Sequence, residues 1–173
     1  MGHSLGGWTA GIYAIENPHR IGRLVLVDAA GLTKLTAGEI DDLKRSLSPT
    51  DRRGARHLFD LLFFRPPARP GGYLLSGLAR SFNDDNVTVT VESLTEADAL
   101  LGREERLPPG TVFIWGAEEL LFPVADARRA AARVPSSRLL VLTGVGHDPP
   151  VEAAALFRRA LLGVLDESAS AQP

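Results

Sequence analysis

The first seven residues, Met1-Gly2-His3-Ser4-Leu5-Gly6-Gly7, decide how the rest of the chain is interpreted. Residues 2–6 form the pattern Gly-x-Ser-x-Gly, in which a serine lies on a sharp turn that leads into a helix. The flanking glycines leave room for the strained backbone of such a turn. Because a pattern this short also occurs by chance, the segments that follow it have to support the interpretation.

Helix and strand patterns alternate at both ends of the chain. Apolar residues at helical spacing predict a helix over residues 8–16, which ends near Asn17-Pro18. The short run Arg23-Leu24-Val25-Leu26-Val27-Asp28, rich in branched apolar residues and ended by Asp28, predicts a strand that is buried on both faces, as in a parallel sheet. Further along, the sequence predicts strands at 111–115 and 138–142 and helices at 124–134 and 151–165. This alternation indicates an α/β fold with a mostly parallel sheet of about three strands and flanking helices.

The middle of the chain, residues 30–109, has a different pattern. Short amphipathic pieces are separated there by prolines and glycines. We therefore predict a helical cap or lid insertion within a single domain that spans residues 1–173. The apolar run at residues 58–64 is compatible with a lipophilic surface, although an apolar helix face is more often part of a core.

Composition excludes several classes of function. Hydrophobic residues make up 45% of the chain and charged residues 23%, as in an ordinary globular protein. The net charge of −2 provides no field that attracts nucleic acid or an anionic membrane surface, and no apolar run reaches the roughly 20 residues of a spanning helix. The chain has no cysteine, so disulfides, thiolate metal sites and a cysteine nucleophile are excluded. We expect a cytoplasmic protein without nucleic-acid or membrane partners.

Residues that can carry chemistry follow the predicted strands. Asp28 ends the first strand, Glu119 follows the second, and His147 follows the third. With Ser4 ahead of them, the order is serine, acid, histidine. Singly, each has a structural explanation: Ser4 as a helix N-cap, Glu119 as a solvated carboxylate and His147 as a loop residue. Their joint placement at strand ends favours a catalytic interpretation.

These motifs together resemble the α/β-hydrolase family. The resemblance rests on residues 1–7, on Trp115-Gly116-Ala117-Glu118-Glu119-Leu120-Leu121-Phe122-Pro123, and on Gly144-Val145-Gly146-His147. It covers most of the chain outside the central insertion. It implies a partial α/β-hydrolase fold that starts at the turn of the nucleophile.

The resemblance also implies a role for each site residue. Ser4 is the expected nucleophile, His147 the general base, and the backbone N–H of Leu5 one donor of the oxyanion hole. Glu119 occupies the place of the acid, three residues after a glycine and four before a proline, where the family more often has aspartate. Asp28 is the alternative acid, although an aspartate that ends this strand is common in the family without a catalytic role.

In the complete family fold, a strand precedes the serine turn and a second oxyanion donor comes from an upstream loop. Because this sequence begins at Met1, we expect a C-terminal part of a longer protein, truncated by roughly 90 to 120 residues. We expect the strand at residues 24–27 to have an unpaired edge and the chain to be weakly active or inactive.

The expected function is that of a serine hydrolase that cleaves a small carboxylic ester through an acyl-enzyme. C–C bond hydrolases, perhydrolases and acyltransferases use similar motifs and remain open, as does a non-catalytic fragment or interaction remnant. No metal or cofactor is expected, because His3 belongs to the serine turn, His19 and His57 have no partner at metal-ligand spacing, and the sequence contains no phosphate-binding loop. The sequence leaves the oligomeric state open.

Overall fold

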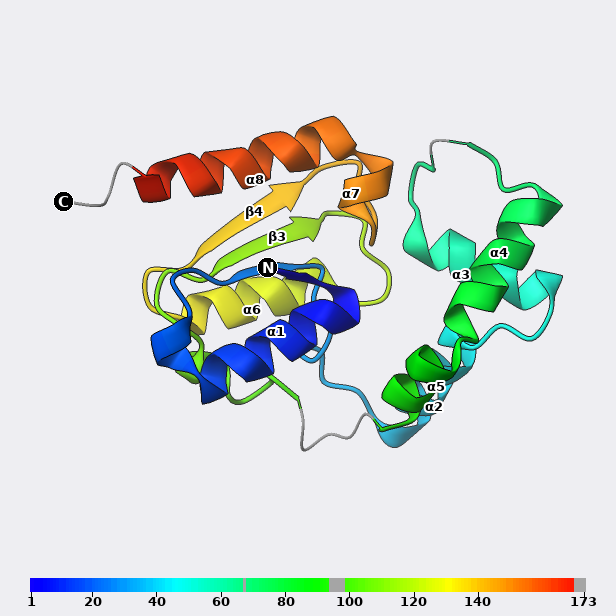
Figure 1. Cartoon of the computed structure of the whole chain (residues 1–173), viewed down its shortest axis with the longest axis horizontal. Helices are drawn as coiled ribbons and strands as arrows, with labels where there is room; N and C mark the ends of the chain where they lie inside the picture. Colours follow the sequence, from blue (N-terminus) through cyan, green and yellow to red (C-terminus); the bar gives the residue numbers. More distant parts are fainter. Residues whose placement is uncertain (67, 94–98, 170–173) are drawn as a thin grey trace.

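The computed structural model describes residues 1–66, 68–93 and 99–169. In these residues the chain forms a four-stranded parallel sheet with helices on both faces (Figure 1). The strands lie in chain order across the sheet: β1 (Gly2–His3), β2 (Val25–Val27), β3 (Val112–Gly116) and β4 (Arg138–Leu142). This arrangement confirms the predicted α/β fold and parallel sheet.

Successive residues of β2 and β3 point to opposite faces of the sheet. Leu26 and Phe113 pack with α1 (Ser4–Glu16) and α6 (Val124–Arg133) on one face. Val27 packs with α8 (Ala154–Ala169) on the other face. Figure 1 shows α1 and α6 together on one side of the sheet and α8 on the other. Because both faces are covered, these strands are continuous apolar runs in the sequence.

Two features differ from the sequence-based expectations. The sheet has a fourth strand, since Gly2 pairs with Leu26 and His3 with Val27, and the expected unpaired edge of β2 is therefore wrong. A strand of two residues has no hydrophobic period, so the sequence gives no sign of it. The expected closing helix is split into α7 (Pro149–Glu152) and α8, because the backbone leaves the helical region at Ala153.

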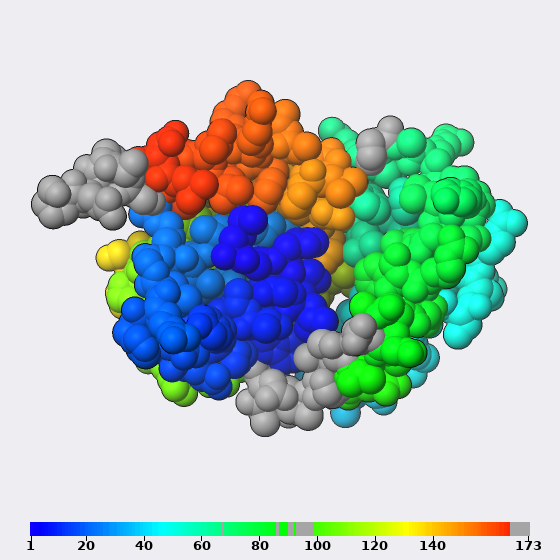
Figure 2. Space-filling model, in the orientation of Figure 1, coloured from blue at the N-terminus to red at the C-terminus, as the bar shows by residue number. Residues whose placement is uncertain are grey.

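Between β2 and β3 the described residues form a group of helices beside the sheet: α2 (Ala37–Leu47), α3 (Arg52–Leu62), α4 (Gly72–Phe82) and α5 (Asp85–Ser93). This group, which we call the cap helices, appears in Figure 2 as a separate cyan-to-green lobe. Ala55, Phe59 and Leu75 form its own small core. Much of the apolar run at 58–64 is thus internal. Residues 67 and 94–98 of the predicted insertion lie outside the described residues.

Short 3-10 helices precede β2 and β3, at η1 (Pro18–Arg20) and η3 (Glu104–Arg106). The starts of two cap helices are set by local capping. Thr36 and Glu39 form a reciprocal capping box at α2, and the Asp51 carboxylate accepts the N–H of Gly54 at 2.7 Å in α3. Among the described residues no helix combines the length and apolar character that a membrane span requires.

Candidate active site

The serine turn lies where β1 leads into α1. Ser4 has φ 53°, in the left-handed region that is uncommon for residues with a side chain. A Cβ on Gly2 would lie 2.2 Å from the carbonyl oxygen of Gly6, and a Cβ on Gly7 would lie 2.6 Å from the Cβ of Ala29. Gly6 itself has open space at that position. The close approach of the backbone therefore requires glycine at positions 2 and 7.

Ser4, His147 and Glu119 form one chain of side-chain hydrogen bonds. His147 Nε2 lies 2.9 Å from Ser4 Oγ, and His147 Nδ1 lies 2.5 Å from Glu119 Oε2. A carboxylate only accepts, so Nδ1–H donates to Glu119 and the lone pair of Nε2 is free to accept from the serine hydroxyl. His147 and Glu119 are both buried. Three elements distant in sequence, the start of α1 and the loops after β3 and β4, meet at this point.

The Glu119 carboxylate is anchored by its own loop. Its Oε1 accepts the backbone N–H of Leu121 at 2.5 Å and of Phe122 at 3.2 Å. These bonds leave Oε2 directed at His147. The extra methylene of glutamate, compared with aspartate, is thus accommodated by a fixed side-chain conformation.

Asp28, the alternative acid, does not bond to His147 but lies behind Glu119. Its Oδ1 accepts the N–H of Gly116 at 2.8 Å, its Oδ2 is buried without a hydrogen-bond donor, and its side chain interacts with that of Glu119. Burial first, and then the Glu119 charge, raise the pKa of Asp28 from 3.8 to about 9. Asp28 is therefore neutral at pH 7 and can donate its proton to the Glu119 carboxylate.

Leu5 is the second residue of α1. Backbone N–H groups in the first turn of a helix have no acceptor within the helix, and the positive end of the helix dipole is located there. An N–H group at this place can stabilise a negative oxygen next to Ser4.

The loop that carries His147 is held by residues that the sequence analysis did not identify. Glu118 Oε2 accepts the N–H groups of Gly144 and Val145 at 2.8 and 3.0 Å. Glu152 Oε2 accepts the N–H of Gly146 at 2.6 Å, and its Oε1 accepts the N–H of Arg65, which lies between α3 and α4.

A third contact to this loop comes from His3, whose Nε2 lies 2.7 Å from the carbonyl oxygen of His147. Burial, followed by the proximity of His147, lowers the pKa of His3, so its ring is neutral and Nε2–H is the donor. His3 lies within the serine pattern and Glu118 directly precedes the predicted acid, so the sequence places both residues next to the predicted site. No sequence pattern links Glu152, on the short helix α7, to the site.

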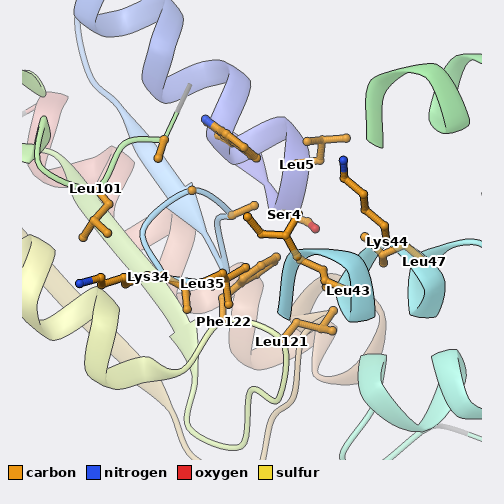
Figure 3. A pocket seen from close by; sticks show the side chains of 16 residues that line it. Ser4, Leu5, Lys34, Leu35, Leu43, Lys44, Leu47, Leu101, Leu121 and Phe122 are labelled. Atoms are coloured by element: carbon orange, nitrogen blue, oxygen red, sulfur yellow. The ribbon is translucent and has the colours of Figure 1, made fainter. Parts of the chain in front are cut away.

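A cavity of about 280 Å³ opens beside Ser4. Figure 3 shows the side chains that line it, which come mainly from α1, α2 and the loops after β2 and β3. Most are apolar, among them Trp8, Leu35, Leu43 and Phe122. The cavity can therefore hold an apolar group next to the serine hydroxyl.

Comparison with known proteins gives a consistent result. The model of the alpha/beta hydrolase family matches residues 1–160. An uncharacterised protein of Mycobacterium bovis is 29% identical over 184 residues, which cover 91% of this chain and 52% of that protein. A 2-hydroxymuconate semialdehyde hydrolase of Pseudomonas putida is 27% identical over 183 residues, with 97% and 62% covered.

Among solved structures, a membrane phospholipase A described as a bacterial virulence factor has a TM-score of 0.79 at 23% identity. The match covers 98% of this chain and 57% of that one. Likeness at this level of identity concerns the fold alone. The chain spans from about half to about three fifths of the length of these relatives.

Proposed function

The chain belongs to the alpha/beta hydrolase family, and on that premise we propose that it is a serine hydrolase that cleaves carboxylic esters. Ser4 is the nucleophile, His147 the general base and Glu119 the acid that orients it. The observation that carries the proposal is the continuous hydrogen-bonded chain from the Ser4 hydroxyl through the His147 ring to the Glu119 carboxylate. A nucleophile, a base in the correct tautomer and an orienting acid are what acyl transfer requires.

The proposed reaction has two halves. His147 Nε2 takes the proton of the Ser4 hydroxyl while Oγ attacks the ester carbonyl, and the resulting oxyanion accepts the Leu5 N–H. The intermediate collapses, His147 returns the proton to the departing alcohol, and the acyl group stays on Ser4. A water molecule then repeats the sequence and releases the carboxylic acid. Glu119 stabilises the imidazolium that exists briefly in each half.

We propose that the cap helices cover the site and that the cavity holds the acyl group. Leu43 of α2 lines the cavity together with Trp8 of α1, so a ligand in this space would contact both the cap and the body that holds Ser4.

The test combines labelling and turnover. The purified chain and its Ser4→Ala variant are treated with a fluorophosphonate, and the modified residue is identified by mass spectrometry. Hydrolysis of 4-nitrophenyl butyrate is measured in parallel. We expect one phosphonylated residue, Ser4, and ester turnover that disappears in Ser4→Ala. A chain that is folded but not labelled at Ser4 would favour the alternative, a non-catalytic interaction module.

A further inference from the structure

One buried polar atom at the cavity beside Ser4 has no partner. The Thr33 hydroxyl oxygen is fully buried and forms no hydrogen bond among the described residues, although Thr33 lines the cavity. An unsatisfied buried hydroxyl costs free energy, and such groups are rare in folded proteins. A ligand in the cavity that accepts a hydrogen bond would satisfy it.

The charged groups at the same cavity are all of one sign among the described residues. The chain has two lysines, Lys34 and Lys44, and both line the cavity, whereas none of the described lining residues is acidic. Figure 3 shows the two ammonium groups on different sides of the cavity. Lys44 donates to the carbonyl oxygen of Glu92 at 3.2 Å. Lys34 follows Thr33 in the chain, and no described residue accepts a hydrogen bond from it.

These features specify the substrate class. Resting on the proposed function, we propose that the cavity binds esters whose apolar acyl chain ends in a carboxylate, and that Thr33 and Lys34 recognise this carboxylate. The Thr33 hydroxyl donates a charge-assisted hydrogen bond to it, and the Lys34 ammonium attracts it. Trp8 and Leu35 contact the apolar part of the chain. One hydroxyl and one ammonium group match a single negative charge.

The first test compares matched esters. The substrates are 4-nitrophenyl monoesters of linear diacids with four to ten carbons, each paired with the same molecule whose free carboxylate is capped as a methyl ester. We expect kcat/KM to be about 10-fold higher for the free acid than for its capped partner at one or more chain lengths, because a hydrogen bond to a charged group is gained. This preference should shrink as ionic strength rises.

Two variants assign the preference to its residues. Thr33→Val keeps the shape of the side chain and removes the orphan hydroxyl, so it should lower kcat/KM for the free acid about 10-fold and leave the capped ester unchanged. Lys34→Gln should lower it by about 3-fold, because an exposed charge contributes less, and Lys34→Arg should restore it. Arg56→Gln, which removes an equal charge from the surface of α3, is the matched control and should change neither value.

A binding measurement separates this proposal from the proposed function. In the Ser4→Ala variant, tryptophan fluorescence is titrated with monomethyl suberate and with dimethyl suberate, because Trp8 lines the cavity while the second tryptophan, Trp115, is buried in the core. Tighter binding of the monoacid that is lost in Thr33→Val supports the carboxylate site even if no ester is hydrolysed. Ser4-dependent turnover without any preference for the free acids, in any chain length, would overturn the carboxylate site and leave the hydrolase function intact. Equal binding of the two suberates would overturn it as well.

Discussion

The most informative single substitution is Asp28→Asn. Asp28 is buried behind Glu119, and its raised pKa of about 9 makes it a neutral hydrogen-bond donor at pH 7. Asparagine has the same shape, its Oδ1 can accept the N–H of Gly116, and its amide can donate to Glu119. We therefore expect a folded protein with little change in turnover.

The effect on stability should be large and should depend on pH. The unfolded chain releases the Asp28 proton above pH 3.8, whereas the folded chain holds it up to about pH 9. Between these values the folded state binds more protons, so this group lowers the stability of the wild type as pH rises. The loss is about 1.4 kcal/mol for each pH unit, or roughly 4 kcal/mol at pH 7. Asparagine does not titrate, so Asp28→Asn removes the loss.

Urea unfolding of both proteins at pH 5, 6, 7 and 8 measures this effect. The stability gained by Asp28→Asn should grow by about 4 kcal/mol from pH 5 to pH 8. Asp60→Asn, at an exposed ion pair on α3, is the control and should show a nearly constant difference over the same range. A stability difference for Asp28→Asn that stays constant from pH 5 to pH 8 would mean that Asp28 is ionised in the folded protein.

Three further substitutions test the other parts of the site. Glu119→Gln should lower kcat by roughly 1,000-fold or more, far more than Asp28→Asn, because of these two carboxyl groups only Glu119 hydrogen-bonds to the His147 ring. Steady-state ester kinetics that rank the two variants in the reverse order would assign the acid to Asp28. Glu152→Gln should lower the free energy of unfolding, measured in urea, by about 1–2 kcal/mol. The carboxylate accepts two backbone N–H groups, whereas the single oxygen of the amide can take the place of only one of its oxygens. An unchanged free energy of unfolding would contradict this role of Glu152. Gly116→Ala should lower kcat by about 100-fold, because its Cβ would lie 2.2 Å from the carbonyl oxygen of Gly146 and displace the histidine loop by roughly 1 Å. The control is Gly22→Ala, where a Cβ meets open space. Equal kcat values for Gly116→Ala and the wild type would refute the steric argument.

The sequence predicted the parts of the fold that have strong periodicity. The runs at β2 and β3 are recognisable because these strands are buried along their whole length and are therefore continuous apolar runs. The strand β4 is only partly buried, but its four consecutive apolar residues after Arg138 still indicate a strand. The serine pattern contains Gly2 and Gly6. The structure requires glycine at position 2, but the second position without space for a side chain is Gly7 rather than Gly6.

The hydrogen bonds that connect the residues of the site could not be predicted from a sequence pattern of this kind. Which carboxylate bonds to His147 depends on where the loop after β3 directs its side chains, and both Asp28 and Glu119 follow strands at the same edge of the sheet. The long-range bond between Glu152 and Arg65 joins segments that are 87 positions apart, and no local pattern encodes such a pairing. Burial and charge around Asp28, which fix its protonation, likewise follow only from the folded arrangement.

The attachment of the cap helices to the histidine loop restricts how this protein can be engineered. The backbone N–H of His147 donates to the carbonyl oxygen of Leu62 at 3.1 Å, and Glu152 joins the same loop to Arg65. A chimera that replaces α2, the cap helix that lines the cavity, leaves these bonds intact and can alter the cavity without moving the general base. Both attachments use backbone groups of residues 62–65, so an exchange that changes the backbone path there shifts them, and Arg65→Pro would remove the N–H that Glu152 accepts. Recombination designs should therefore place their crossover points outside this segment.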